Sequence, residues 1–168
     1  MADQRDGGIA WTDRSWNCVR GCTRVDGGCG GAVGVGGCYA EKMAGRFSGP
    51  GLPYEGLVRI GKNGPRWTGV VKLIPERLAD PLRWRKPQRI FVNSMSDLFH
   101  EGLRFEEIAA VFAIMEDAPK HAFQILTKRP HRARDFFKWL AMTTDRDDMG
   151  CESDTVQLAL RNVAPSVF

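Results

Sequence analysis

The sequence predicts an α/β domain built on parallel strands. Two short apolar segments, 89–94 and 122–127, are each followed by an amphipathic helical pattern. This alternation is typical of a βαβ unit, in which a crossover joins two parallel strands. A chain of 168 residues suits one domain with a substantial core. The predicted strands are too few to close an eight-stranded barrel, so we expect an open or partial arrangement.

The chain divides into three regions by composition. Residues 1–66 are rich in Gly, Pro and polar residues and contain a glycine-rich loop with cysteines, followed by a helix-like segment at 40–47. Residues 67–142 form the βαβα core of the same domain, because strand and helix patterns alternate there. Residues 143–168 form a polar tail that fits no pattern and includes Cys151, which we expect to be an ordinary thiol.

The elements of the core follow from local patterns. Segment 69–74 (GVVKLI) indicates a strand, and Pro75 suits the first turn of a helix through 84, which Pro81 should shorten or break. Segment 89–94 (RIFVNS) is a continuous apolar run of the kind that is buried on both faces of a parallel sheet.

The two long helices of the core have clear apolar faces. Helix 105–118 carries one stripe, 122–127 forms the second buried strand, and Pro130 opens the last helix. The expected inward residues are Phe105, Ile108, Ala109, Phe112 and Met115 in the first helix and Ala133, Phe136, Phe137 and Leu140 in the second.

Polar side chains follow both buried strands at the point where each strand ends. Asn93, Ser94, Ser96, Asp97, His100 and Glu101 come after the first, and Thr127, Lys128 and Arg129 after the second. Active sites of parallel α/β folds lie beyond the carboxyl ends of the strands, so we expect these groups at one crevice. Taken singly, a turn-capping role for Ser96 or Asp97 and an exposed position for Lys128 are equally reasonable, and His100 fits a local hydrogen-bonding role better than a ligand role.

Composition and charge bear on the cell compartment of the protein and on its possible partners. The sequence lacks an apolar stretch long enough to cross a bilayer and shows no signal-peptide pattern, so we expect a cytoplasmic protein. The net charge of +4 is mild, but basic clusters at 83–89 and 128–134 fit either contact with nucleic acid or a solvated surface.

Four cysteines precede the first strong helix of the core. Cys18, Cys22, Cys29 and Cys38 have the spacing C-x3-C-x6-C-x8-C, which is neither a paired zinc knuckle nor the usual ferredoxin pattern. In a reducing compartment, clustered thiols favour metal binding over disulfides. Three thiolates on a glycine-rich loop suit a four-iron cluster with one open iron, whereas zinc on four cysteines and a thiol set without ligand remain alternatives.

Several motifs resemble an uncharacterised three-cysteine family of phages and prophages, which is related to the radical S-adenosylmethionine superfamily near its spore photoproduct lyase-like branch. The resemblance covers roughly residues 9–140 and rests on IAWTDRSWNCVRGCTRV, CYAEKMAGRF, PLRWRKPQRIFVNSMSDLFHE and FQILTKRPHRAR. It implies a partial, open parallel βα barrel of radical S-adenosylmethionine type. The family commonly has proline where this chain has Cys18, so the resemblance implies cluster ligation by Cys22, Cys29 and Cys38.

The resemblance also implies roles for the strand-end residues. Asp97 and Lys128 are the expected catalytic residues, and Tyr39, Asn93, Ser94 and Ser96 are expected to contact the cofactors, a 4Fe-4S cluster and S-adenosylmethionine. The implied activity is that of a radical S-adenosylmethionine lyase or transferase with an unknown substrate, nucleic acid among the candidates. A phage-encoded protein of this kind would act in the host cytosol.

Two alternatives accompany this expectation. One is a nucleic-acid-binding module, stabilised by zinc or a cluster, that uses Arg83, Arg85, Lys86, Arg129 and Arg132 to contact DNA or RNA. The other is an inactive, truncated family member, because family members usually continue with further strands beyond the position of Phe168. In that case a partner chain could complete the barrel.

Overall fold

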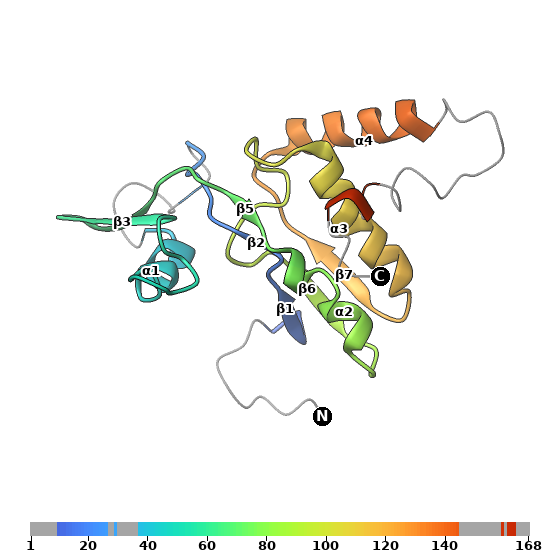
Figure 1. The fold of residues 1–168 in the computed structure, drawn as a ribbon, viewed down its shortest axis with the longest axis horizontal. Coiled ribbons are helices and arrows are strands. Elements are labelled where there is room, and N and C mark those ends of the chain that lie inside the picture. The colour runs from blue at the N-terminus through green and yellow to red at the C-terminus, as the bar shows by residue number, and fades with distance from the viewer. Residues whose placement is uncertain (1–9, 27–28, 30–36, 145–158, 160, 164–168) are drawn as a thin grey trace.

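A three-stranded parallel sheet organises the larger part of the molecule (Figure 1). The computed structural model describes residues 10–26, 29, 37–144, 159 and 161–163, so Cys151 and most of the predicted polar tail lie outside the described residues. The sheet has the order β1 (Arg14–Trp16), β6 (Arg89–Val92) and β7 (Ala122–Ile125). The predicted parallel pairing of the two apolar strands is confirmed, with Val92 opposite Ile125.

The strand β1 was not predicted from the sequence. It is three residues long and pairs in parallel with β6, so that Trp16 lies opposite Val92. Trp16 is the buried residue of this strand, and its indole Nε1 donates a hydrogen bond to the carbonyl oxygen of Arg77 at 2.7 Å.

Helix α3 (Phe105–Asp117) joins β6 to β7 and is buried on more than the predicted stripe. Ile108 and Ala109 are buried as predicted, but Ala110, Val111, Ala113 and Ile114 are also inaccessible to solvent, since α3 also contacts α2 and α4. Arg104 precedes the helix, and its backbone N–H donates to the Glu107 carboxylate at 2.7 Å, which closes a capping box.

Helix α4 (Pro130–Thr144) begins at the predicted proline. Phe136 is fully buried among aromatic rings, and Ala133 and Leu140 pack at the edge of the core. The prediction that Phe137 faces inward is wrong in part, because its side chain is 49% exposed although the ring touches Phe99 and Phe112.

The predicted strand 69–74 is reduced to the two residues of β5 (Lys72–Leu73), which pair antiparallel with β2 (Val19–Arg20) and not with the main sheet. Gly69 has φ +91, a conformation outside the strand region. The following helix is broken, as predicted, into a 3₁₀ turn η1 (Pro75–Arg77) and α2 (Asp80–Arg83). The break lies at residues 78–79 and not at Pro81, because Pro81 fits the first turn of α2.

A second, smaller lobe contains the helix predicted at 40–47. It consists of α1 (Tyr39–Gly45) and the hairpin β3 (Val58–Gly61) and β4 (Gly64–Trp67), which contact one another (Figure 1). Its own apolar cluster comprises Ala40, Ala44, Tyr54, Leu57, Val58, Trp67 and Met95. No helix in the described part of the chain has the length and hydropathy that a bilayer crossing requires.

The molecule is therefore mixed α/β with small open sheets. The partial barrel of radical S-adenosylmethionine type remains a prediction.

Candidate functional site

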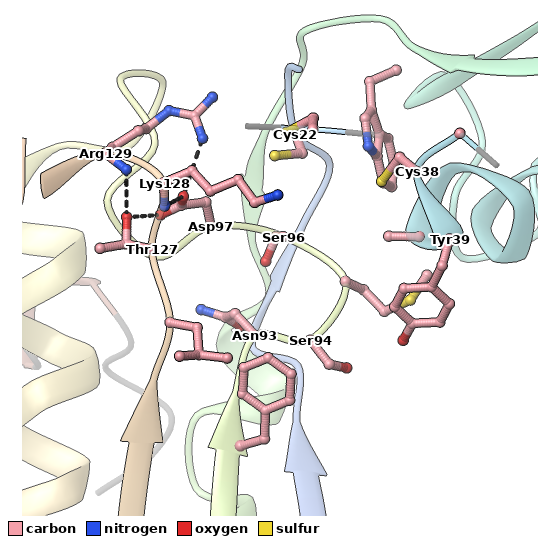
Figure 2. A pocket seen from close by; sticks show the side chains of 17 residues that line it. Cys22, Cys38, Tyr39, Asn93, Ser94, Ser96, Asp97, Thr127, Lys128 and Arg129 are labelled. Atoms are coloured by element: carbon pink, nitrogen blue, oxygen red, sulfur yellow. Dashed lines mark hydrogen bonds and ion pairs between the residues drawn. The ribbon is translucent and has the colours of Figure 1, made fainter. Parts of the chain in front are cut away.

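A cavity of about 780 Å³ lies beyond the carboxyl ends of β6 and β7, where the cysteine loop and α1 approach the sheet (Figure 2). It is lined by residues from these three parts of the chain: Cys22, Cys29, Gly37, Cys38, Tyr39, Ala40, Trp67, Phe91, Asn93, Ser94, Met95, Ser96, Asp97, Leu126, Thr127, Lys128 and Arg129. All predicted metal, cofactor and catalytic residues are thus found in the wall of one cavity.

Asp97 joins the two strand ends. Its Oδ1 accepts hydrogen bonds from the Phe99 N–H at 3.0 Å and the Thr127 hydroxyl at 2.8 Å. Its Oδ2 accepts from the Lys128 N–H at 3.0 Å and from Arg129 Nη1 at 3.2 Å. With four donors on its two oxygens, this carboxylate holds the end of β7 against the segment that follows β6.

The guanidinium of Arg129 is buried and links Asp97 to two further groups. Its Nε donates to Glu101 Oε2 at 2.8 Å, and its Nη2 donates to the Thr23 hydroxyl at 2.7 Å. Because Thr23 directly follows Cys22, Arg129 also attaches the segment that carries Cys22 to the ends of β6 and β7. Lys128 extends its amine into the cavity from the end of β7 (Figure 2).

Asn93 has an unusual backbone and an unusual side chain. Its φ is +60, the one positive φ of a residue other than glycine in the described part of the chain. Its Oδ1 accepts the Val19 N–H at 3.1 Å, which fixes the orientation of the amide, and its Nδ2 is buried without a hydrogen-bond partner. An unpaired buried donor costs free energy, and strained residues of this kind cluster at functional sites.

The two serines of the strand-end segment bond to protein groups. The Ser94 hydroxyl donates to Asn17 Oδ1 at 3.2 Å, and the Ser96 hydroxyl donates to the Val19 carbonyl at 3.0 Å. Asn17 Oδ1 also accepts the Met95 N–H at 3.1 Å. These bonds shape the turn after β6, so both serines have a structural role besides their place in the cavity wall.

The cysteines differ in environment. Cys18 is fully buried, its Sγ lies 3.7 Å from Asn93 Oδ1, and burial raises its pKa far above the ordinary range. Burial also raises the pKa of Cys22, to about 11, although nearby Arg129 opposes the shift. Cys29 Sγ accepts the Val25 N–H at 3.3 Å, and Cys38 is the N-cap residue of α1. The four thiols are free, and Cys18 is absent from the cavity wall.

His100 behaves as the local hydrogen-bonding residue that was predicted. Its Nδ1 accepts the Gly102 N–H at 2.9 Å, so the ring proton is on Nε2, which lies 2.9 Å from the Thr23 hydroxyl. Burial and the charge of Arg129 lower its pKa, which favours the neutral ring.

Comparison with known proteins gives a family but no activity. The model of the family described as "Protein of unknown function (DUF5131)" matches residues 6–164. The chain belongs to this family. No curated protein and no solved structure matches the chain.

The residues predicted to contact nucleic acid are not brought together in this family member. Arg83, Arg85 and Lys86 are exposed and precede β6, so they lie at the edge of the sheet opposite the cavity. Arg129 is enclosed in ion pairs, and Arg132 stacks on Phe105 at 4.1 Å and donates to the Leu103 carbonyl. The ring of Trp84 is covered by the guanidinium of Arg14 at 4.7 Å.

Sequence reasoning missed Glu41, which lies three residues after Cys38. Its side chain is almost fully buried and accepts Arg24 Nη2 at 2.6 Å, Arg24 Nε at 3.0 Å and the Trp67 N–H at 3.1 Å. A glutamate on an apolar helix face, close to a cysteine, was the available signal. Asn17, next to Cys18, was likewise missed and had no distinguishing pattern.

Proposed function

We propose that Cys22, Cys29 and Cys38 hold a 4Fe-4S cluster in this cavity and that the protein is an enzyme of radical S-adenosylmethionine type with an unknown substrate. One observation carries the proposal: the three cysteines of the loop and the polar residues after both parallel strands line a single cavity. A cluster and a bound nucleoside require such a shared space.

The residues present fit such a cofactor in donor chemistry and in room. Three thiols that face one cavity are the donor set of an iron–sulfur cluster. In the described part of the chain, no three His, Cys, Asp or Glu side chains stand close enough to share one metal ion. The unpaired Nδ2 of Asn93 supplies a donor that a bound group would satisfy.

The residues of the cavity wall have different roles in this proposal. When bound, the cluster supplies an electron for reductive cleavage of S-adenosylmethionine. Lys128 places a positive charge in the cavity, and Asn93 offers an amide donor, so both suit acceptor atoms of a ligand. Phe91, Leu126 and Trp67 supply the apolar part of the cavity wall. Asp97 positions the wall through its four hydrogen bonds rather than through a free oxygen.

The test is metal analysis of protein purified and reconstituted without oxygen. We expect about four irons and four sulfides per chain with broad visible absorption near 400 nm, lost in Cys22→Ala and retained in the matched variant Cys18→Ala. Stoichiometric zinc that survives reconstitution would replace the cluster by a structural zinc site. Absence of both metals, or equal iron in Cys22→Ala and the parent, would contradict the proposal.

Nucleic-acid binding at the opposite sheet edge is the second candidate, because Arg83, Arg85 and Lys86 are exposed there. Phosphate contacts give an affinity that falls steeply with salt. Replacing both Arg85 and Lys86 with Gln should lower the slope of log affinity against log salt by about two. Equal affinity of this variant and the parent for duplex and single-stranded DNA at low salt would remove this candidate.

A further inference from the structure

We propose that the ion pair between Arg24 and Glu41 is the positioning element that closes the cysteine loop and places its thiols around one cavity. The inference rests on the proposed function for its purpose, since it assigns the residues that hold the three proposed ligands in place. It concerns the loop geometry itself and can be tested without a cluster.

The contacts have the form of a strong, oriented pair. The Arg24 guanidinium donates to both carboxylate oxygens, from Nη2 to Oε2 at 2.6 Å and from Nε to Oε1 at 3.2 Å. Glu41 is 1% exposed, whereas the Arg24 side chain is one-third exposed. A bidentate guanidinium–carboxylate pair fixes direction as well as distance.

The pair spans the part of the chain that carries the cysteines. Arg24 follows Cys22 by two residues, Glu41 follows Cys38 by three, and the two are 17 residues apart in sequence. Cys38 is the N-cap residue of the helix on whose first turn Glu41 lies. The guanidinium also lies against Gly37, since a Cβ built there would stand 3.6 Å from Arg24 Nη2. Arg24 is therefore near Gly37, which precedes Cys38, and binds Glu41, which follows it by three residues.

Each end of the pair is attached to a different part of the fold. Glu41 Oε1 accepts the Trp67 N–H of β4 at 3.1 Å, which fixes the carboxylate in the small lobe. On the other side, Thr23 is bound by Arg129 from the end of β7. The next residue after Arg24 donates its N–H to Cys29 Sγ at 3.3 Å. Closing the pair consequently brings the arm with Cys22 and Cys29 to the helix that carries Cys38.

Chain length alone would not achieve this. The closure cost of a loop depends only weakly on its length, so length by itself does not select one among the possible positions of the two ends. A bidentate pair with one buried partner selects one of them. Arg66 also lies near Glu41, at 3.6 Å, but it comes from β4 in the small lobe, and its hydrogen bond and ion pair among the described residues are to Pro65 and Glu41. It therefore supplies a matched control.

The experiment measures whether thiols of the two arms can be bridged in metal-free protein. Phenylarsine oxide condenses with two neighbouring thiols, forming two As–S bonds and releasing one water. The parent for this assay carries Cys18→Ala, Cys29→Ser and Cys151→Ser, so that Cys22 and Cys38 are the two cysteines left for stable capture, and mass spectrometry identifies the bridged peptides. We expect Arg24→Met to weaken retention about tenfold, equivalent to about 1.4 kcal/mol, Arg24→Lys to restore part of it, and Arg66→Met to match the parent.

A second variant guards against simple misfolding. Glu41→Gln keeps an acceptor for the Trp67 N–H and removes the charge, so it should reproduce the loss, and the double variant Arg24→Met/Glu41→Gln should lose little more than either single variant. Additive losses, or retention in Arg24→Met equal to the parent, would overturn the inference. If Arg24-dependent bridging occurs in protein that takes up no iron, the proposed function fails while the inference stands; iron uptake unchanged in Arg24→Met would count against the inference alone.

Discussion

Replacing Asp97 with Asn tests whether this carboxylate holds the site together. The amide can keep one oxygen toward Phe99 and Thr127, but its NH₂ group then faces the Lys128 N–H and Arg129 Nη1, which are both donors. Each hydrogen bond to a charged group contributes about 1.5–3 kcal/mol, and breaking a buried pair costs about 3–5 kcal/mol. Glu101 still binds Arg129 at 2.8 Å, so we expect the low end, a loss of about 3 kcal/mol.

The assay is urea unfolding of metal-free protein followed by circular dichroism. With a slope of about 2 kcal/mol per molar urea, the midpoint should fall by about 1.5 M. Glu101→Gln is the control, because this carboxylate binds the same guanidinium but its side chain is 63% exposed, and its loss should cost less than about 1 kcal/mol. A midpoint shift below about 0.5 M in Asp97→Asn, or equal shifts in both variants, would refute the structural role derived above.

Three further predictions concern the backbone and pH. Asn93→Ala should be less stable than Asn93→Gly by about 1 kcal/mol in urea unfolding, because both lose the side chain but only glycine accepts φ +60 freely; equal stability would contradict the strain. Gly21→Ala should lower the free energy of unfolding by more than about 3 kcal/mol, because a Cβ would overlap the Val70 carbonyl oxygen. Gly56→Ala, at φ +73, meets open space and should lower it by about 1 kcal/mol. The difference between the thermal midpoints of the two variants measures this. Burial and Arg129 lower the pKa of His100 in the folded protein, so the unfolded chain binds this proton at a higher pH. The free energy of unfolding should therefore fall as the pH drops below about 6.5 and level off below the folded pKa. In His100→Asn, the slope of this free energy between about pH 6.5 and 5 should be shallower.

The local patterns of the sequence were sufficient for two strands and the two long helices of the core, but not for segment 69–74. The strands β6 and β7 are continuous apolar runs, α3 begins where its apolar stripe does, and α4 begins at Pro130. Strand β1 escaped prediction because its three residues have no period of their own and gain their partner from β6, 76 residues away at Arg14 and Ile90. Pairing over such separations is decided by tertiary packing rather than propensity.

The location of the candidate site could be predicted from the sequence, but its hydrogen bonds and ion pairs could not. The rule that polar groups gather beyond parallel strand ends placed Asn93, Asp97 and Lys128 at one cavity with the cysteines. The four hydrogen bonds to the Asp97 carboxylate and the burial of Glu41 depend on which donors the folded chain brings near them. No spacing of residues in the sequence predicts that. Charge counting also missed that Arg129 and Arg132 are used inside the protein.

Of the two apolar clusters of the molecule, the smaller one borders the cavity through Ala40, Trp67 and Met95. The larger cluster packs the parallel sheet against α3 and α4, and the smaller one joins α1 to the β3–β4 hairpin and includes Met95 from the segment after β6. Cys22 and Cys38 pack against the smaller cluster. A cluster of so few residues has little cooperativity of its own, so the small lobe should open in amide exchange at lower free energy than the sheet. A group bound across the cavity would join both parts into one cooperative unit. Binding should then slow amide exchange most strongly in β3 and β4, although Trp67 is their one described residue that lines the cavity.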